Sequence, residues 1–260
     1  MTNNNRILQV ESLTKTYGKG STQTEALRGI SFDVLEGEFL GIMGASGSGK
    51  TTLLNCIATM LKPSAGKIIL HGKDIASFKG TQLADYRGKE IGYLFQEFEL
   101  LDNLTAKENI TLPLALHGIS GKEADERIAT IATKLDITDV LDKFPAQLSG
   151  GQKQRVAAAR ALISNPSIVL ADEPTGALDS KNSKILMDKL AAINDSEQKT
   201  IMMVTHNASV ASYCSRILFI QDGSLFHELR RSAQKETPST FYERVMTVLA
   251  QMGGGSANVL

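Results

Sequence analysis

The sequence has few cysteines and no surplus of charge. It holds 2 cysteines in 260 residues, and its 28 Lys and Arg residues balance 28 Asp and Glu residues. There is no CxxC pair, so we expect no disulfide framework, and Cys56, in the apolar run LLNCIATML, is expected to be a buried thiol in a reducing cytoplasm. The balanced charge argues against a nucleic-acid partner, because domains that bind nucleic acids usually carry a basic surplus.

Long apolar runs are also lacking. The longest, SIVLA and TIMMV, fall well short of the roughly 18 residues that a membrane-spanning helix needs. The amino-terminal stretch MTNNNRILQV contains no apolar signal core. We therefore expect that this chain does not cross a membrane unaided.

Strand and helix patterns alternate from Phe39 onward, which is typical of a parallel sheet covered by helices in an α/β fold. Strands are predicted at Ile7–Val10, Ile30–Val34, Phe39–Met43, Lys67–His71, Ile91–Gln96, Ser167–Ala171, Thr200–Thr205 and Ile217–Ile220. Helices are predicted at Thr51–Leu61, within Thr105–Asp136, and at Gln152–Ile163, Lys181–Ile193 and Ala208–Ser215. After Asp222 the sequence predicts a polar, less regular tail that ends in one helix, TFYERVMTVLAQM.

The stretch GASGSGKTT follows a predicted strand and opens a predicted helix, which is the setting of a phosphate-binding loop. Its glycines allow backbone N–H groups to converge on phosphate oxygens, its lysine supplies a cation, and its first threonine can bind Mg²⁺. A Gly- and Ser-rich turn that matches by chance is the alternative, but the flanking strand and helix favour the site. The predicted binding residues are Gly44, Ala45, Ser46, Gly47, Ser48, Gly49, Lys50, Thr51 and Thr52.

Two carboxylates follow the buried strand of IVLADE, at the edge of the sheet where ligands bind. Asp172 can hold Mg²⁺, and Glu173 can orient or deprotonate an attacking water. An acidic turn that caps a helix before Pro174 is the alternative. The neighbouring phosphate loop favours the catalytic interpretation.

Three further residues can be assigned a role only from their position in the chain. Gln96 ends a strand and could reach Mg²⁺ or the attacking water, or it could be a solvated loop residue. His206 ends another strand and could contact the γ-phosphate, or be an ordinary histidine at a strand end. Tyr17 could stack on adenine or pack on the sheet.

The stretch QLSGGQKQR places a serine and two glycines before a helix, which is a second cradle for an anion. The order of GASGSGKTT, Gln96, LSGGQ, LADE, the ALD of Ala177–Asp179 and His206 resembles that of the ATP-binding cassette (ABC) ATPases. The resemblance covers about residues 6–228. It implies a phosphate-loop ATPase with a RecA-like parallel-sheet core, an N-terminal antiparallel β lobe and a helical subdomain at about 98–150, followed by a tail at 229–260.

In ABC ATPases two copies pair head to tail, with each ATP between the phosphate loop of one copy and the LSGGQ of the other. The resemblance therefore implies ATP and Mg²⁺ as cofactors, Thr51, Gln96 and Asp172 as metal ligands, and Glu173, His206 and Gln96 as catalytic residues. It also implies that the partner copy's nucleotide is contacted by Ser149, Gly150, Gly151, Gln152 and Asp179.

Less specific sequence stretches resemble those of a subgroup of these ATPases. ADEPTGALDS and LFQEFELLDNLTAKENITLPL are similar to lipoprotein-release and macrolide-export cassettes, whereas IMGASGSGKTTLLN, HNASVASYCSRILFIQDG and TFYERVM resemble bacitracin-type peptide-resistance ATPases of Gram-positive bacteria. That family usually has Asp where this chain has Asn207. The resemblance implies resistance to bacitracin-like or lantibiotic peptides. The alternatives are a lipoprotein or macrolide cargo, or a soluble ABC ATPase that acts on ribosomes or DNA.

The same resemblance implies a membrane permease, a second copy of the chain, a sensor histidine kinase, and a peripheral location on the inner face of the cell membrane. Phe98, Leu100 and Leu101 could form a socket for the permease or simply pack in the subdomain core. An apolar stripe in the last helix could fold back on its own domain, bind the permease or pair with its copy. That stripe consists of Phe241, Val245, Val248 and Leu249.

Overall fold

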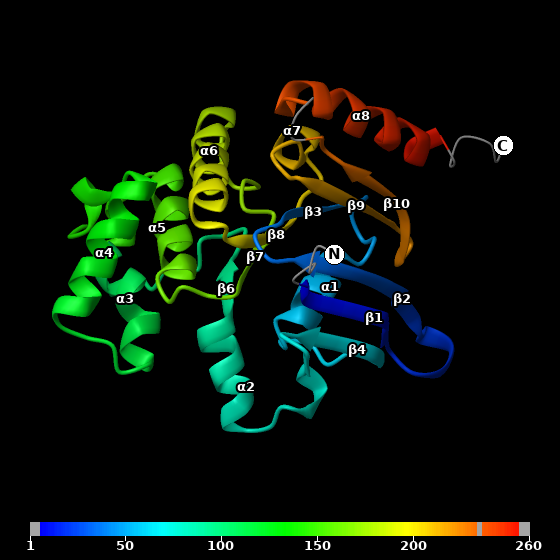
Figure 1. Ribbon diagram of the computed structural model, residues 1–260, viewed down its shortest axis with the longest axis horizontal. Helices are drawn as coiled ribbons and strands as arrows, with labels where there is room; N and C mark the ends of the chain where they lie inside the picture. The colour runs from blue at the N-terminus through cyan, green and yellow to red at the C-terminus, as the bar shows by residue number, and fades with distance from the viewer. Residues whose placement is uncertain (1–5, 233–235, 255–260) are drawn as a thin grey trace, which may run out of the picture. The chain divides into compact units, whose positions relative to one another are not determined.

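An antiparallel sheet is formed by the amino-terminal part of the chain in the computed structural model, which describes residues 6–232 and 236–254. Its strand order is β2-β1-β4-β5, built from β1 (Arg6–Tyr17), β2 (Thr24–Leu35), β4 (Ala65–Leu70) and β5 (Lys73–Asp74) (Figure 1). Leu8, Val10 and Leu13 are buried, and a register shift between the last two keeps them on one face, with Ser12 at φ +45°. This sheet confirms the expected antiparallel lobe.

The described chain divides into two compact units, of which the first consists of the described residues up to Ser77 and from Met202 onward. Besides the antiparallel sheet, it contains β3 (Phe39–Met43), β9 (Arg216–Gln221) parallel to it, and β10 (Ser224–Arg230) antiparallel to β9. Strand β8 (Thr200–Val204) follows β3 in the order β10-β9-β3-β8. All five residues of β3 are buried, as expected for a strand inside a parallel sheet.

Strand β10 corrects the prediction of an irregular tail after Asp222. Most of its side chains are exposed, so the strand has no alternation of apolar and polar residues that a sequence pattern could detect. Hydrogen bonding to β9 holds it in the sheet instead. The two small elements β5 and α2 (Thr81–Asp85) were also not predicted.

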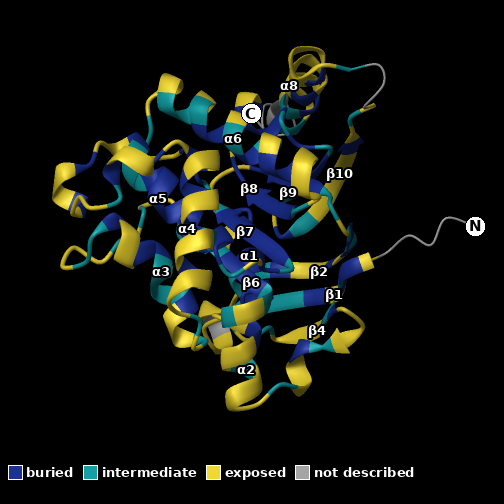
Figure 2. Cartoon of the chain, turned by 60° about the vertical axis from the view of Figure 1, so that its left-hand side comes forward, coloured by how far each residue is buried: buried dark blue, intermediate teal, exposed yellow. Residues whose placement is uncertain are grey.

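The second unit comprises Phe78–Ile201. It pairs β6 (Ile91–Leu94) in parallel with β7 (Ile168–Asp172), and four residues of β7 are buried as predicted. Helix α5 (Gly150–Leu162) packs against α3 (Ala106–Leu116), α4 (Lys122–Leu135) and α6 (Ser180–Glu197). In Figure 2 strand β7 is largely buried, while helices such as α4 carry exposed outer faces.

Helix boundaries differ from the predictions where the backbone turns. Helix α1 (Lys50–Ile57) is shorter than the predicted Thr51–Leu61, because Thr59 adopts φ +57° and the chain leaves the helix there. The helical period from Thr105 to Asp136 is divided between α3 and α4. Gly118 and Gly121, with φ of +72° and +65°, form the turn between them.

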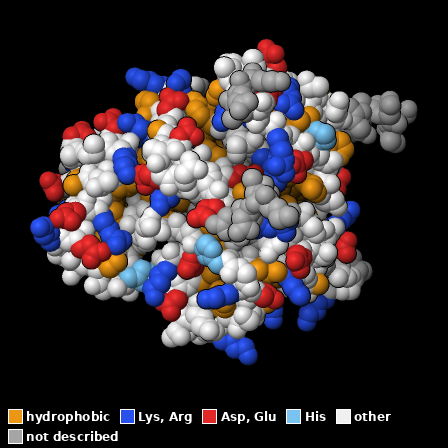
Figure 3. All heavy atoms as spheres, viewed as in Figure 1, with side chains coloured by type: hydrophobic (Ala, Val, Ile, Leu, Met, Phe, Trp, Pro, Cys, Tyr) orange, Lys and Arg blue, Asp and Glu red, His pale blue; other side chains and the backbone are white. Residues whose placement is uncertain are grey.

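Helix α8 (Pro238–Gly254) folds back on the first unit and packs against α7 (Ala208–Ala211). Phe241, Val245 and Val248 are buried, as the apolar stripe predicts, whereas Leu249 is only half-buried. No helix in residues 6–232 and 236–254 is long and apolar enough to cross a bilayer. On the face in Figure 3, basic and acidic side chains are interspersed, in line with the balanced charge.

Candidate functional site

The loop between β3 and α1 curls around the side chain of its own lysine. The Nζ atom of Lys50 donates hydrogen bonds of 2.9 Å to the carbonyl oxygen of Gly44 and 2.8 Å to that of Ala45. Lys50 is only 6% exposed although its side chain is charged. The loop therefore presents a cation at the start of a helix, where an anion is stabilised.

Two glycines of this loop are required by the fold. A Cβ atom at Gly44 would collide with the carbonyl oxygen of Ile220 and lie 2.6 Å from the hydroxyl of Ser48. Gly49 has φ +101°, and a Cβ there would collide with the carbonyl oxygen of Ala26. The loop can therefore approach its neighbours this closely only without side chains at these positions.

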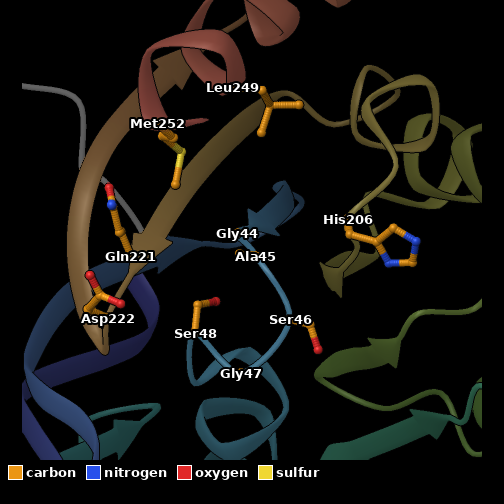
Figure 4. A pocket seen from close by; sticks show the side chains of 10 residues that line it. All are labelled: Gly44, Ala45, Ser46, Gly47, Ser48, His206, Gln221, Asp222, Leu249 and Met252. Atoms are coloured by element: carbon orange, nitrogen blue, oxygen red, sulfur yellow. The ribbon is translucent and has the colours of Figure 1, made fainter. Parts of the chain in front are cut away.

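Ser48 shows that the loop suits a phosphate. Its side chain is 5% exposed, and its hydroxyl has no hydrogen-bond partner within the part of the chain that is described. A buried hydroxyl without a partner is costly, and a phosphate oxygen would satisfy it. Gly44–Ser48 line a cavity of about 710 Å³, together with His206, Gln221, Asp222, Leu249 and Met252 (Figure 4). The residues present thus fit the phosphates of a nucleotide.

Tyr17 lies beside the helix that follows this loop. Its hydroxyl is 3.5 Å from the Oγ1 atom of Thr52, and the Lys15 ammonium lies 5.2 Å from the centre of its ring. The residue is 41% exposed, so the ring is not part of the core. An exposed aromatic ring can stack on a base.

His206 follows β8 and is exposed at the cavity of the phosphate loop (Figure 4). Its neighbour Asn207 caps α7, because its Oδ1 atom accepts a hydrogen bond of 2.9 Å from the N–H of Ser209. An aspartate would cap the helix in the same way. The departure from the family pattern at Asn207 therefore preserves the local hydrogen bonding.

The second unit carries the two carboxylates. Asp172 is the last residue of β7, and Glu173 next to it adopts φ +44°, which is unfavourable for a residue with a side chain. Burial raises the pKa of Tyr93, and the Asp172 carboxylate, to which the phenol is hydrogen-bonded, raises it further. Tyr93 therefore stays protonated and can donate to Asp172.

Gln96 and the loop of Glu173 are joined by a residue that sequence reasoning missed. The Nε2 atom of Gln154, on α5, donates to the carbonyl oxygens of Phe95 at 2.9 Å and Pro174 at 2.6 Å. Gln154 is fully buried. Its amide therefore fastens together the backbones of the segments that carry Gln96 and Glu173. Its helical spacing from Ala157 and Ala158, which places it on the apolar face of the helix, is the one signal that could have indicated this role.

The LSGGQ stretch forms the start of α5, as predicted. Ser149 is the N-cap: its hydroxyl accepts from the N–H of Gln152 at 3.3 Å, and its own N–H donates to Gln152 Oε1 at 2.9 Å. The hydroxyl proton of Ser149 remains available for an external acceptor. Ser149 and Gly150 are exposed, so the positive end of the helix is accessible to an anion. Asp179 is also exposed and caps α6.

The segment after Gln96 is anchored by two polar residues that the sequence did not reveal. The Arg160 guanidinium donates to the carbonyl oxygens of Phe98, at 2.9 Å, and Glu99. The side chain of buried Asn109 donates to the carbonyl oxygen of Leu101 and accepts from its N–H. Leu101 remains 45% exposed. The segment is thus held in place while an apolar side chain stays accessible.

The described residues contain no cluster of three or more His, Cys, Asp or Glu side chains that could hold a metal ion. The predicted metal ligands Thr51, Gln96 and Asp172 carry oxygen donors, which Mg²⁺ prefers. Mg²⁺ usually binds few protein groups and takes its other ligands from phosphates and water. This donor set therefore fits Mg²⁺ that arrives with a nucleotide.

Proteins similar to this chain are ATP-binding cassettes of transporters. The family described as ABC transporter matches residues 27–176, more than half of the chain. The bacitracin export ATP-binding protein BceA of Halalkalibacterium halodurans is 48% identical over 248 residues, which cover 95% of this chain and 97% of that protein. The macrolide export ATP-binding/permease protein MacB of Syntrophobacter fumaroxidans is 42% identical over 84% of this chain but 31% of its own length.

Solved structures show the same fold. The ATP-binding cassette MJ0796, in a dimeric post-hydrolysis state bound to ADP and Pi, is 39% identical and has a TM-score of 0.79. The match covers 86% of this chain and 99% of that cassette.

Proposed function

The chain belongs to the ABC transporter family and is the ATP-hydrolysing cassette of a membrane transporter; on this basis we propose that the transporter confers resistance to bacitracin-like or lantibiotic peptides. The observation that carries this proposal is the 48% identity to a bacitracin export cassette over nearly the whole of both chains. The match to MacB supports the second candidate, a macrolide or lipoprotein cargo, but it covers only the cassette part of that longer protein.

In this proposal the phosphate loop binds ATP through its backbone N–H groups, Lys50 and Ser48. Tyr17 stacks on the base, and Thr51, Gln96 and Asp172 supply oxygen ligands to Mg²⁺, which when bound offsets the negative charge of the phosphates. Glu173 orients the attacking water and accepts its proton. His206, at the cavity of the loop, contacts the γ-phosphate.

We assign the second cradle to a second copy of the chain. The hydroxyl oxygen of Ser149 already caps its own helix, but its hydroxyl proton can still be donated, and the start of the helix is exposed. These groups suit an anion that another molecule brings. The solved cassette with ADP and Pi is dimeric, which supports a site shared between two copies. Gly151, Gln152 and Asp179 belong to the same half-site.

The permease is assigned to the second unit. There, a cavity of about 240 Å³ is lined by apolar side chains such as Leu112 and Leu116, the latter 77% exposed. An accessible apolar surface of this kind suits a helix of a membrane subunit. The chain would then lie on the inner face of the membrane. The histidine kinase that the resemblance implies has no support from the residues described above or from the compared proteins.

The catalytic part of the proposal is tested by Glu173→Gln. The amide keeps the size of the side chain but cannot accept a proton, so ATP binding should persist while turnover falls at least about 100-fold. Size-exclusion chromatography with ATP should show a trapped dimer. Normal ATPase activity of this variant would contradict the role of Glu173.

The cargo is tested in a bacitracin-sensitive bacterium that expresses this chain with its permease. Resistance should rise to bacitracin but not to a macrolide, and the Glu173→Gln variant should abolish the gain. Protection against the macrolide alone would favour the second candidate.

A further inference from the structure

Asp179 is held mainly by Asn182, on the first turn of the same helix, with a smaller contribution from Lys181. The Nδ2 atom of Asn182 donates to both oxygens of the Asp179 carboxylate, at 3.1 and 2.9 Å. The backbone N–H of Asn182 donates to Oδ1 of the same carboxylate at 2.7 Å. These bonds lower the pKa of Asp179, the backbone bond more than the side-chain bond. An exposed carboxylate that could rotate freely is thereby fixed in one orientation.

The other end of the same amide lies against the LSGGQ stretch. Because Nδ2 faces the carboxylate, Oδ1 of Asn182 faces Gly151, near the start of α5. A Cβ atom at Gly151 would collide with this oxygen and lie 2.5 Å from Cγ of Asn182. Gly151 does not have a positive φ, so the close approach, rather than the backbone conformation, requires a glycine here.

The glycine before it provides a comparison. A Cβ atom at Gly150 would meet only Phe98 and Leu178, at 3.8 and 4.0 Å, which are ordinary contacts. Of these two adjacent glycines, only Gly151 is packed this closely against a side chain. Asn182, a residue of α6, is half-buried, and its amide is restrained by the Asp179 carboxylate on one side and by Gly151 on the other.

We propose that Asn182 is a positioning residue that couples the start of α5 to Asp179. Through its amide, the LSGGQ cradle and the Asp179 carboxylate keep a fixed relative orientation and act as one surface on the nucleotide of a second copy. This inference rests on the proposed sharing of the site between two copies. Asn182 itself contacts no substrate.

The first test is kinetic. In Asn182→Ala the carboxylate and the cradle are uncoupled, so kcat should fall about 10-fold, the equivalent of about 1.4 kcal/mol. KM for ATP should change much less, because the phosphate loop is untouched. Asn182→Asp should also lose kcat, because it places two carboxylates side by side. Lys184→Ala, which removes an exposed ion pair with Asp188 on the same helix, serves as the control and should retain its activity.

The second test uses the steric contact. Gly151→Ala should reduce kcat strongly in the natural sequence. In the Asn182→Ala background the same change should cost clearly less, because the oxygen that it would displace is gone. Equal losses in both backgrounds would show that the two residues are not coupled and would overturn the inference.

The third test asks whether Asn182 acts on the site of the other copy. A limiting amount of Asn182→Ala chain is mixed with an excess of Lys50→Ala chain, which is itself inactive but carries an intact α5 and Asp179. ATPase activity should be restored. An excess of the double variant Lys50→Ala/Asn182→Ala should restore nothing, although it differs only at Asn182. Restored activity also shows that the Asn182→Ala chain is folded.

The same mixtures with Ser149→Ala in place of Asn182→Ala distinguish the role of Asn182 from the sharing of the site between two copies. Rescue in the Ser149 series but not in the Asn182 series overturns the role of Asn182 and leaves the shared site intact. If neither series shows rescue, the proposed sharing between copies fails, and the role of Asn182 fails with it.

Discussion

The Nζ atom of Lys50 lies 2.9 Å from the carbonyl oxygen of Gly44 and donates a hydrogen bond to it. The lysine thus closes the loop that we propose binds the phosphates, and hydrogen bonds within the loop fix the position of its charge. A group that is positioned in advance loses less conformational entropy on binding.

Lys50→Met should therefore weaken ATP binding while leaving the chain folded. Methionine has a similar length but no charge, and hydrogen bonds to charged groups contribute about 1.5–3 kcal/mol, so affinity should fall roughly 10- to 150-fold. Titration with a fluorescent ATP analogue measures the change. Lys73→Met, on the exposed strand β5, is the matched control. Unchanged affinity in Lys50→Met would contradict the assignment of the loop.

Helix α8 should contribute to the stability of the first unit through its buried face. Phe241 is fully buried and Tyr242 next to it is 37% exposed. Phe241→Ala should lower the free energy of unfolding by about 3–5 kcal/mol, and Tyr242→Ala by less than about 1 kcal/mol. Urea denaturation followed by circular dichroism tests the difference. Equal, small effects would mean that α8 is not packed as described.

Both cysteines should be unreactive in the native chain. Burial raises the pKa of Cys56 to about 11 and that of Cys214 further, and both side chains are fully buried. At pH 8 only about one Cys56 thiol in a thousand would be ionised, and the thiolate is the reactive form. A thiol reagent should modify neither cysteine in buffer but both in concentrated urea. Rapid modification of the native chain would show that one of these regions opens, and Cys56→Ser would identify which.

Several parts of the site could be predicted because their signals are local. The loop around Lys50 is built from glycines and a flanking strand and helix that are contiguous in the sequence. The cap at Ser149 likewise depends on Gln152, three residues away. Strand β7 was recognisable because a strand buried on both faces consists of consecutive apolar residues.

Other parts could not be predicted because their partners are distant in the sequence. Gln154 binds the carbonyl oxygen of Phe95, 59 residues away, and Arg160 binds that of Phe98, 62 residues away. Every residue has a backbone carbonyl, so no residue pattern indicates which carbonyl a distant polar side chain will bind. Strand β10 was missed for a related reason, because its exposed residues lack a period.

The sequence by itself determined the chemistry that this protein can perform, because glycine, lysine and carboxylate positions act through short-range backbone geometry and charge. It also determined the fold class through the periods of its apolar residues. Only the tertiary structure decided that the amide of Asn182 lies between Gly151 and Asp179. That contact depends on the packing of α5 against α6, since side chains from separate helices meet only once the core between them has formed.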